Sequence, residues 1–315
     1  MRKIKTLVLG AAIVDKILEI GKLPKSGDDI CASSEVLTVG GCAYNVANML
    51  KNFEVDHDLV VPVGSGIYGS LVEKDLLDNG YEVLIRDNRK DNGYCLCLVE
   101  GYGERAFITI QGTECEFKKE WLCSLNSKDY KNIYISGYEL EGKSGEVICD
   151  FLESNNHLNI YFAPGPRISN LDKNILERIY DLYPIIHLND KEALEYTGLS
   201  SVEDAIFDIY GKSNNTVFIT LGAKGVLYLN PSIAKYNDRL KESIKLIEGN
   251  KVEVVDTIGA GDNHLASIIA AKSLGYSFEN SCKIANEVAS KVVSIKGPKI
   301  EKHLFNKGEY LKCKM

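Results

Sequence analysis

Short apolar runs alternate with amphipathic stretches along most of this 315-residue chain. The runs are rich in Val, Ile and Tyr and are bounded by Gly, Pro or Asn, so they predict buried strands: Thr6–Leu9, Asp58–Pro62, Ile133–Ser136, Ile160–Ala163, Ile185–Leu188 and Val217–Leu221. The amphipathic stretches predict helices at Gly41–Asn52, Gly69–Asn79, Gly145–Asn155, Asn170–Leu182, Lys191–Thr197, Val202–Ile209, Gly261–Leu274 and Phe278–Ile295. Because this alternation is typical of helices that cover both faces of a sheet, we expect a three-layer α/β/α fold with a mainly parallel central sheet.

Two stretches, residues 12–40 and 93–111, break the alternation and read as strands with no helix between them. In the second, the turn sequence Gly101-Tyr102-Gly103-Glu104 separates two strand-like runs, which favours a hairpin. Together they predict a small β-sheet lid outside the main sheet. No shift in composition marks a linker, so we expect residues 1–315 to form one α/β domain with the lid inserted in it.

The composition excludes several classes of protein. The net charge is −7, which disfavours a broad nucleic-acid surface. No run approaches the roughly 18 apolar residues that span a bilayer, so we expect a cytoplasmic protein that binds neither nucleic acid nor membrane. The nine cysteines are an odd number and are scattered, and they are expected to be small buried thiols rather than disulfides.

The segment from Val254 to His264 carries the chemistry. An apolar pair ends a strand, a Gly-Ala-Gly turn follows, and a helix of small residues begins. Glycines let the backbone approach a ligand closely, and the free N–H groups and dipole at a helix start bind anions. Asp262 stands at that start. It is either a cap or dipole partner of the helix, or a base that takes a proton from a hydroxyl beside the anion site, and residue types alone leave both interpretations open.

Four segments in this order resemble those of the ribokinase-like, or PfkB, carbohydrate kinases, and the resemblance covers nearly the whole chain. They are Gly40-Gly41-Cys42-Ala43-Tyr44-Asn45-Val46-Ala47, Asn189-Asp190-Lys191-Glu192, Thr220-Leu221-Gly222-Ala223-Lys224-Gly225 and Asp256-Thr257-Ile258-Gly259-Ala260-Gly261-Asp262. The resemblance implies an ATP-dependent kinase that phosphorylates a hydroxyl of a sugar-like molecule and uses Mg²⁺.

The resemblance also implies roles on the nucleotide side. Asp262 matches the catalytic base, and Gly259, Ala260 and Gly261 match the anion hole. The positions that match ATP-binding residues are Asn189, Thr220, Gly222, Gly225 and Asn286. Glu192 matches a position that holds Mg²⁺ through water. The simpler interpretations are a helix capping box for Asn189 and Glu192 and a strand-to-strand turn for Gly222 and Gly225.

On the substrate side, the resemblance implies contacts from Asp15, Gly41, Cys42, Asn45 and Glu139. Cys42 stands where ribokinases commonly carry a lysine, which weakens the case for ribose. Many relatives bind a monovalent cation, here K⁺, and the matching positions are Asp256, Ile258, Val292, Ile295 and Gly297. An exposed lid sheet often pairs across a dimer in this family, so we expect a homodimer through the lid.

Two alternative functions stay open. One is a nucleoside or pseudouridine-type kinase, and the other is a catalytically idle sugar- or nucleotide-binding regulatory protein. A vitamin-type kinase is disfavoured by the 93–111 hairpin. Three residues have no assigned role: Arg105 reads as a solvated lid residue, Arg167 follows a predicted strand end where α/β sites gather, and His264 either packs in its helix or lines the pocket.

Overall fold

The computed structural model describes residues 4–101, 104–231 and 243–312, and the chain divides into two compact units. The larger unit comprises residues 1–9, 45–58 and 117–315, and the smaller comprises residues 10–44 and 59–116. The expected organisation as one domain stays a prediction.

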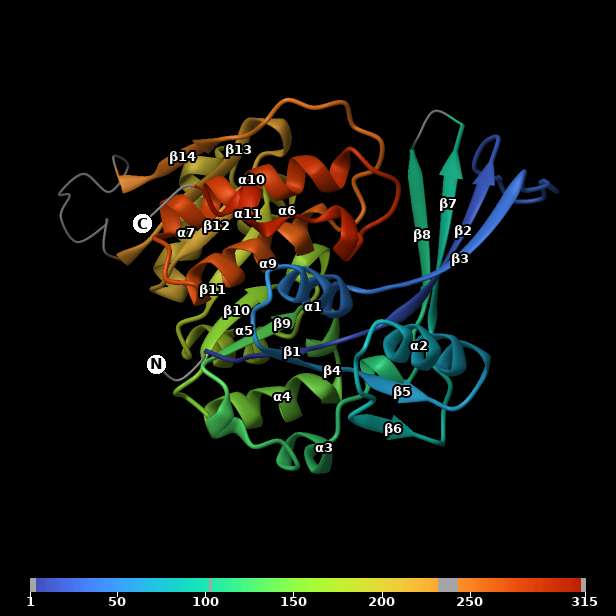
Figure 1. The fold of residues 1–315 in the computed structure, drawn as a ribbon, viewed down its shortest axis with the longest axis horizontal. Coiled ribbons are helices and arrows are strands. Elements are labelled where there is room, and N and C mark those ends of the chain that lie inside the picture. The colour runs from blue at the N-terminus through green and yellow to red at the C-terminus, as the bar shows by residue number, and fades with distance from the viewer. Residues whose placement is uncertain (1–3, 102–103, 232–242, 313–315) are drawn as a thin grey trace. The chain divides into compact units, whose positions relative to one another are not determined.

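The larger unit is built on an eight-stranded sheet in the order β14-β13-β12-β11-β10-β9-β1-β4 (Figure 1). Neighbours from β1 to β12 are parallel, whereas β13 and β14 are added antiparallel. The predicted mainly parallel sheet is therefore confirmed, and its antiparallel extension is new. The strands are β1 (Thr6–Leu9), β4 (His57–Val60), β9 (Asn132–Ser136), β10 (Asn159–Ala163), β11 (Ile185–Asn189), β12 (Val217–Thr220), β13 (Gly225–Leu229) and β14 (Lys245–Glu248).

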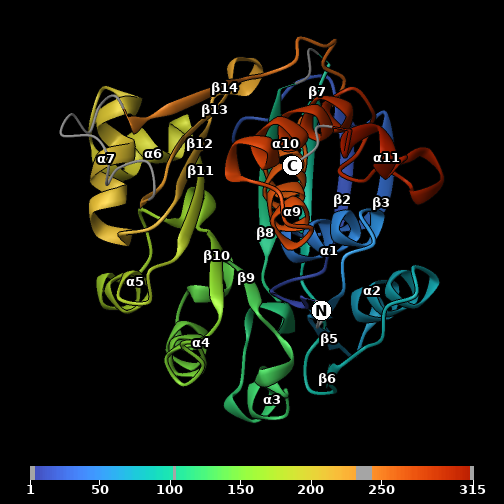
Figure 2. The ribbon, with the colours of Figure 1, turned by 60° about the vertical axis from the view of Figure 1, so that its left-hand side comes forward.

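Helices cover both faces of this sheet, as the rotated view shows (Figure 2). One layer contains α1 (Cys42–Asn52, of which residues 45–52 belong to this unit), α9 (Ala260–Ser273), α10 (Phe278–Val293) and α11 (Lys307–Tyr310). The other layer contains α3 (Lys119–Cys123), α4 (Lys143–Glu153), α5 (Lys173–Tyr180), α6 (Asp190–Thr197) and α7 (Val202–Ser213). Helix α9 is buried from Asn263 to Ala271, and its small side chains let neighbouring elements pack closely against it.

The smaller unit contains the sheet predicted from residues 12–40 and 93–111. Its four strands have the order β3-β2-β7-β8, in which only the central pair β2 and β7 is parallel. The unit also contains a two-stranded parallel sheet and helix α2. The elements are β2 (Ile13–Ile20), β3 (Ser34–Gly40), β5 (Pro62–Gly64), α2 (Ile67–Asp78), β6 (Ile85–Asp87), β7 (Tyr94–Glu100) and β8 (Arg105–Ile110). The predicted strand Asp58–Pro62 is thus wrong in its bounds, since β4 ends at Val60 and β5 begins at Pro62.

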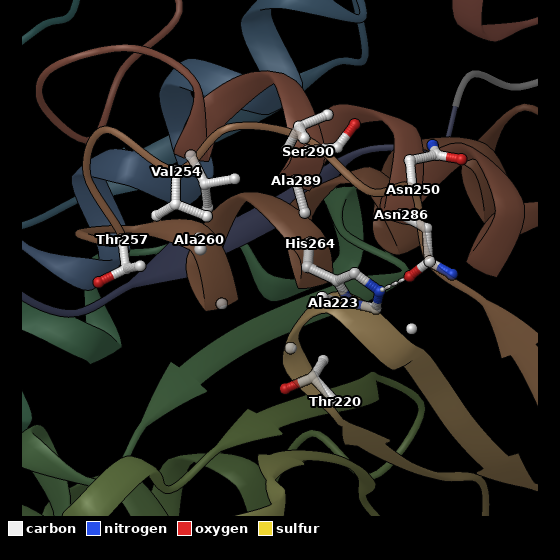
Figure 3. A pocket seen from close by; sticks show the side chains of 16 residues that line it. Thr220, Ala223, Asn250, Val254, Thr257, Ala260, His264, Asn286, Ala289 and Ser290 are labelled. Atoms are coloured by element: carbon white, nitrogen blue, oxygen red, sulfur yellow. Dashed lines mark hydrogen bonds between the residues drawn. The ribbon is translucent and has the colours of Figure 1, made fainter.

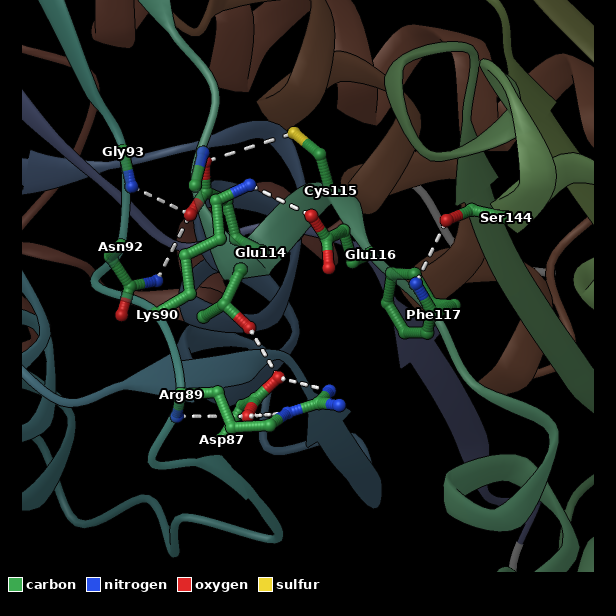
Figure 4. A network of polar contacts seen from close by, with 12 residues as sticks. Asp87, Arg89, Lys90, Asn92, Gly93, Glu114, Cys115, Glu116, Phe117 and Ser144 are labelled. Carbon is green, nitrogen blue, oxygen red and sulfur yellow. Dashed lines mark hydrogen bonds and ion pairs between the residues drawn. The ribbon is translucent and has the colours of Figure 1, made fainter.

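A buried glutamate, Glu114, connects the start of β7 with the end of β8 in the four-stranded sheet (Figure 4). Glu114 is fully buried, and its two carboxylate oxygens accept from the N–H groups of Gly93 and Gly112, each at 2.8 Å. Gly93 precedes β7 and Gly112 follows β8, so one side chain ties the two ends of the hairpin together. Asn92 adds an amide donor to the same carboxylate at 3.3 Å. No sequence motif indicated this network.

The eight cysteines in the described residues form no disulfide with one another, and Cys313 lies outside the described residues. Cys31 and Cys123 are exposed, so the expectation that all are buried is wrong. A helix long and apolar enough to cross a membrane does not occur in the described ranges 4–101, 104–231 and 243–312.

Candidate active site

The turn before α9 depends on a glycine in the left-handed region. Gly259 has φ of 70°, and a Cβ added there would lie 2.6 Å from the Cβ of Pro298. Asn263 holds the turn closed, since its side-chain amide donates to the carbonyls of Gly259 (2.7 Å) and Pro298 (2.8 Å). Sequence reasoning missed Asn263. The Ala260 N–H donates to the Thr257 carbonyl at 3.3 Å. Residues 259–261 thus lie at a helix start, where N–H groups and the helix dipole favour anions, and an anion site there stays a prediction.

Asp262 is the third residue of α9 and is half-buried. The side-chain amide of Asn45, from α1, donates to its Oδ2 at 2.9 Å. Asn45 is only 4% exposed, and its Oδ1 has no hydrogen-bond partner within the described part of the chain. The two predicted site residues are therefore in direct contact, and a buried amide oxygen beside them can accept a hydrogen bond from a ligand.

Glu139 lies in the short 3₁₀ turn Tyr138–Leu140 that follows β9. It is 2% exposed and accepts a 2.5 Å hydrogen bond from the Ser136 hydroxyl. Burial raises the pKa of Glu139 from 4.5 to about 7; Ser136 and backbone donors partly oppose this rise, and the charge of Asp262 adds to it. The charge of Asp262 therefore affects the pKa of Glu139, and the Glu139 carboxyl group is largely protonated below pH 7.

Asn189 and Glu192 form the capping box of α6. The Glu192 N–H donates to Asn189 Oδ1 at 2.8 Å, and the Asn189 N–H donates to Glu192 Oε2 at 3.0 Å. The capping interpretation is thus confirmed, which leaves a ligand role for the same residues untested. Burial raises the pKa of Glu192, while its contacts with Asn189 lower it and the charge of Asp262 raises it further.

A cavity of about 320 Å³ lies beside the start of α9 (Figure 3). It brings together most of the predicted nucleotide residues, including Thr220, Gly222, Gly225 and Asn286, with Ala260 and Gly261 of the anion turn. Gly222 lies in the connection between β12 and β13, and Gly225 begins β13, so both also belong to the strand-to-strand turn. The lining is Thr220, Gly222, Ala223, Gly225, Gly249, Asn250, Val252, Val254, Thr257, Ala260, Gly261, His264, Asn286, Ala289, Ser290 and Val293.

A largely apolar cavity that is lined in part by the predicted anion turn could hold a ring that carries phosphates. His264, for which two interpretations were open, lines this cavity and is also buried, with an exposure of 3%. Its ring points toward Asn286, to which it is hydrogen-bonded (Figure 3).

Three predicted substrate residues lie together in the smaller unit. Gly41 has φ of 105°, and a Cβ there would lie 2.6 Å from the carbonyl oxygen of Ala11. A Cβ at Gly40 would overlap the carboxylate of Asp15. The Gly-Gly pair thus lets β3 run directly against Asp15, and Cys42 begins α1 immediately afterwards.

Hydrogen bonds connect the five positions of the predicted cation site in two groups. The Asp256 carboxylate accepts from the N–H groups of Ile258 (2.8 Å) and Gly297 (3.0 Å). The Ile295 N–H donates to the Val292 carbonyl at 3.2 Å. The contacts group Asp256 with Ile258 and Gly297, and Ile295 with Val292. Cation binding by these residues stays a prediction.

The two unassigned arginines differ in their surroundings. Arg167 lies 3.4 Å from Glu141 and over the ring of Tyr138, at 5.2 Å from its centroid, so local contacts occupy it. Arg105 is half-buried in β8, opposite Val99 in the register, rather than fully solvated.

The fold and this site together are those of one class of protein: an α/β phosphotransferase with a glycine turn at a helix start, a carboxylate beside it and a neighbouring cavity. Residues 3–303 match the pfkB family of carbohydrate kinases, and the chain belongs to that family. Its members are phosphotransferases that act on a sugar hydroxyl.

Individual proteins agree with this assignment. The chain is 31% identical to an uncharacterized sugar kinase, YegV, of Escherichia coli K12, over 92% of this chain and 89% of that protein. Ribokinase of Thermotoga maritima has the same fold, with a TM-score of 0.81 and 20% identity over 98% of this chain and 99% of that one. Arabidopsis thaliana ribokinase, solved with ribose and ATP, has a TM-score of 0.78 and 20% identity over the whole of both chains.

Proposed function

We propose that this kinase transfers the γ-phosphoryl group of ATP to a hydroxyl of a sugar or sugar-like small molecule, with Asp262 as the base. One observation carries the proposal. Asp262 directly follows the Gly259–Gly261 turn, of which Ala260 and Gly261 line the cavity, and its carboxylate accepts a hydrogen bond from the Asn45 amide at 2.9 Å. The donor is proposed to be ATP because the similar ribokinase of Arabidopsis was solved with ribose and ATP.

In the proposed reaction, Asp262 takes the proton of the acceptor hydroxyl as that oxygen attacks the γ-phosphorus. The new oxygen–phosphorus bond forms while the bond from the γ-phosphorus to the bridging oxygen breaks, and ADP leaves with that electron pair. The backbone N–H groups at residues 259–261 donate to the oxygens of the moving group, where negative charge must be held. The proton on Asp262 passes to solvent.

Two carboxyl groups, those of Glu139 and Glu192, are affected by the charge of Asp262, and carboxylate oxygens are ligands that Mg²⁺ prefers. No group of three or more His, Cys, Asp or Glu side chains able to hold a metal occurs in the described ranges, so a cage made of protein ligands is not seen there. Mg²⁺ usually keeps several waters and binds through one or two carboxylates together with substrate phosphates. Glu192 is proposed to hold it in this way. When bound, the ion neutralises phosphate charge. The predicted K⁺ requirement stays a prediction.

The acceptor is proposed to be a polyhydroxylated ring. The unpaired Oδ1 of Asn45 can accept from a hydroxyl, and a protonated Glu139 can both donate and accept. Cys42 supplies no charged donor where ribokinases commonly have a lysine, so sugars other than ribose, and nucleosides, belong in the first screen.

A homodimer through the four-stranded sheet is also proposed. The exposed large apolar side chains of this sheet lie on its two edge strands, β3 and β8: Val36, Leu37, Phe107, Ile108 and Ile110. Exposed apolar edges of this kind favour pairing with another chain. The cytoplasmic location stays a prediction.

The test is ADP formation from MgATP across a panel of pentoses, hexoses, sugar phosphates and nucleosides. We expect turnover that depends on one acceptor class, with the product phosphate located by ³¹P NMR. Binding of ATP without turnover on any acceptor would refute the kinase proposal and favour the idle regulatory protein.

A further inference from the structure

A chain of buried polar side chains runs behind the proposed nucleotide cavity. His187 Nε2 lies 2.9 Å from His264 Nδ1, and His264 Nε2 lies 3.1 Å from Asn286 Oδ1. The Asn286 amide nitrogen then donates to the carbonyls of Ile247 (3.0 Å) and Glu248 (2.9 Å). All three side chains are at least nine-tenths buried. The chain therefore joins β11, α9, α10 and β14.

The direction of every hydrogen bond in this chain follows from chemistry. The two backbone carbonyls only accept, so the Asn286 nitrogen must face them and its oxygen must face His264. His264 Nε2 then carries the proton, which leaves its Nδ1 as an acceptor. His187 Nε2 must carry a proton in turn. Each ring is thus needed in one neutral tautomer.

The surroundings favour those neutral forms. Burial lowers the pKa of His264 to about 4, and burial with the neighbouring His264 lowers the pKa of His187 well below its usual value. Neither ring is therefore charged near pH 7, and the donor order from His187 to Asn286 is preserved.

The chain connects the two elements that carry the proposed phosphate chemistry. His187 lies two residues before Asn189 on β11, and His264 lies two residues after Asp262 on α9. His264 lines the cavity, whereas His187, within the part of the chain that the structure describes, does not. The hydrogen bond to His264 therefore links the His187 side chain to the cavity.

We propose that His187 is a positioning residue, which acts through His264 to hold the start of α9 against the end of β11. This arrangement sets the affinity of the site for the nucleotide phosphates. This inference rests on the proposed function, because it assumes that a nucleotide binds beside α9. Without the His187 donor, the buried Nδ1 of His264 has no partner, and the cost of an unsatisfied buried acceptor favours a shift of the ring and its helix.

The experiment measures binding of MgATP and of MgADP by titration calorimetry, which needs no acceptor. His187→Leu keeps most of the side-chain volume and removes the donor, and we expect the Kd for both nucleotides to rise about three- to tenfold. His187→Gln keeps an N–H donor at a similar reach and should restore Kd to within about twofold of wild type. Leu152→Ala is the matched control. Leu152 is a buried residue of α4, so its truncation leaves a cavity and should lower Tm without changing Kd.

A double-variant cycle tests the route of the effect. In a His264→Phe background, His187→Leu should cause no further change in Kd, since the link is already broken. A Kd for His187→Leu within twofold of wild type, with only Tm reduced, would overturn the inference. So would a full effect of His187→Leu in the His264→Phe background. Wild-type protein that binds neither nucleotide would refute the proposed function together with the inference.

Discussion

Glu139 gives the sharpest prediction about stability, because a buried acid with a raised pKa destabilises the fold once it must ionise. Its pKa is about 7 in the folded protein, against 4.5 for an ordinary glutamate. Between these two values the folded state holds a proton that the unfolded state has lost, so stability falls as pH rises through this window. Below about pH 4.5 both states are protonated and no penalty exists. Above about pH 7 both are ionised and the penalty is constant.

The size of the effect follows from the shift. A shift of about 2.5 pKa units corresponds to about 3 kcal/mol, at 1.36 kcal/mol per unit. Glu139→Gln cannot ionise and can still accept from the Ser136 hydroxyl. We therefore expect the variant to be more stable than wild type by up to about 3 kcal/mol at pH 8, with the difference fading to near zero at pH 4.5.

The assay is urea unfolding of both proteins at pH 4.5, 6, 7 and 8, with free energies taken by linear extrapolation. Glu177→Gln, at an exposed site in α5, is the control and should stay within about 0.5 kcal/mol of wild type at every pH. A difference between Glu139→Gln and wild type that is the same at all four pH values would refute the reasoning.

Three further changes have defined outcomes. Gly259→Ala places a Cβ on a residue with φ of 70° and against Pro298, so it should lower the unfolding free energy by about 1–3 kcal/mol and impair turnover. Its control is Gly211→Ala, inside α7 with open space around it, which should be neutral or stabilising in thermal unfolding. Asn45→Leu removes the amide that contacts Asp262 and should lower kcat about tenfold or more in a steady-state assay, while an unchanged kcat would show that the contact is only structural. Phe107→Lys combined with Ile108→Lys should convert the expected dimer to monomer in sedimentation; a dimer that persists would place the interface elsewhere.

The sequence predicted the main elements well, because buried parallel strands and amphipathic helices have strong periodic patterns. Seven of the eight predicted helices lie within about three residues of the observed bounds, as α9 does; Val202–Ile209 is too short, because α7 continues to Ser213. The separate sheet of the smaller unit was also predicted, from two stretches that lack helical periodicity. The strand β14 was missed, since it is mostly exposed and carries charged residues at both ends.

The site was predicted through its glycine turns and polar motifs, which are local in sequence. The contacts that hold it together are not local. Asn45 reaches Asp262 across 217 residues, and His187 reaches His264 across 77. Asn263 lies directly after Asp262 in the sequence, but its role in closing the turn depends on a hydrogen bond to the carbonyl of Pro298, 35 residues away. Pairings of this kind arise from the packing of α9 against other elements and leave no spacing rule in one sequence.

The central claim is that Asp262 is the base rather than a helix partner, and one comparison tests it directly. Asp262 and Asp204 each occupy the third position of a helix, α9 and α7, so their interactions with the helix dipole are alike. ADP formation is measured with the acceptor found in the panel. We expect Asp262→Asn to fold and bind MgATP but to lose about 100-fold or more in kcat, while Asp204→Asn keeps wild-type turnover. Near wild-type turnover by Asp262→Asn would contradict the account.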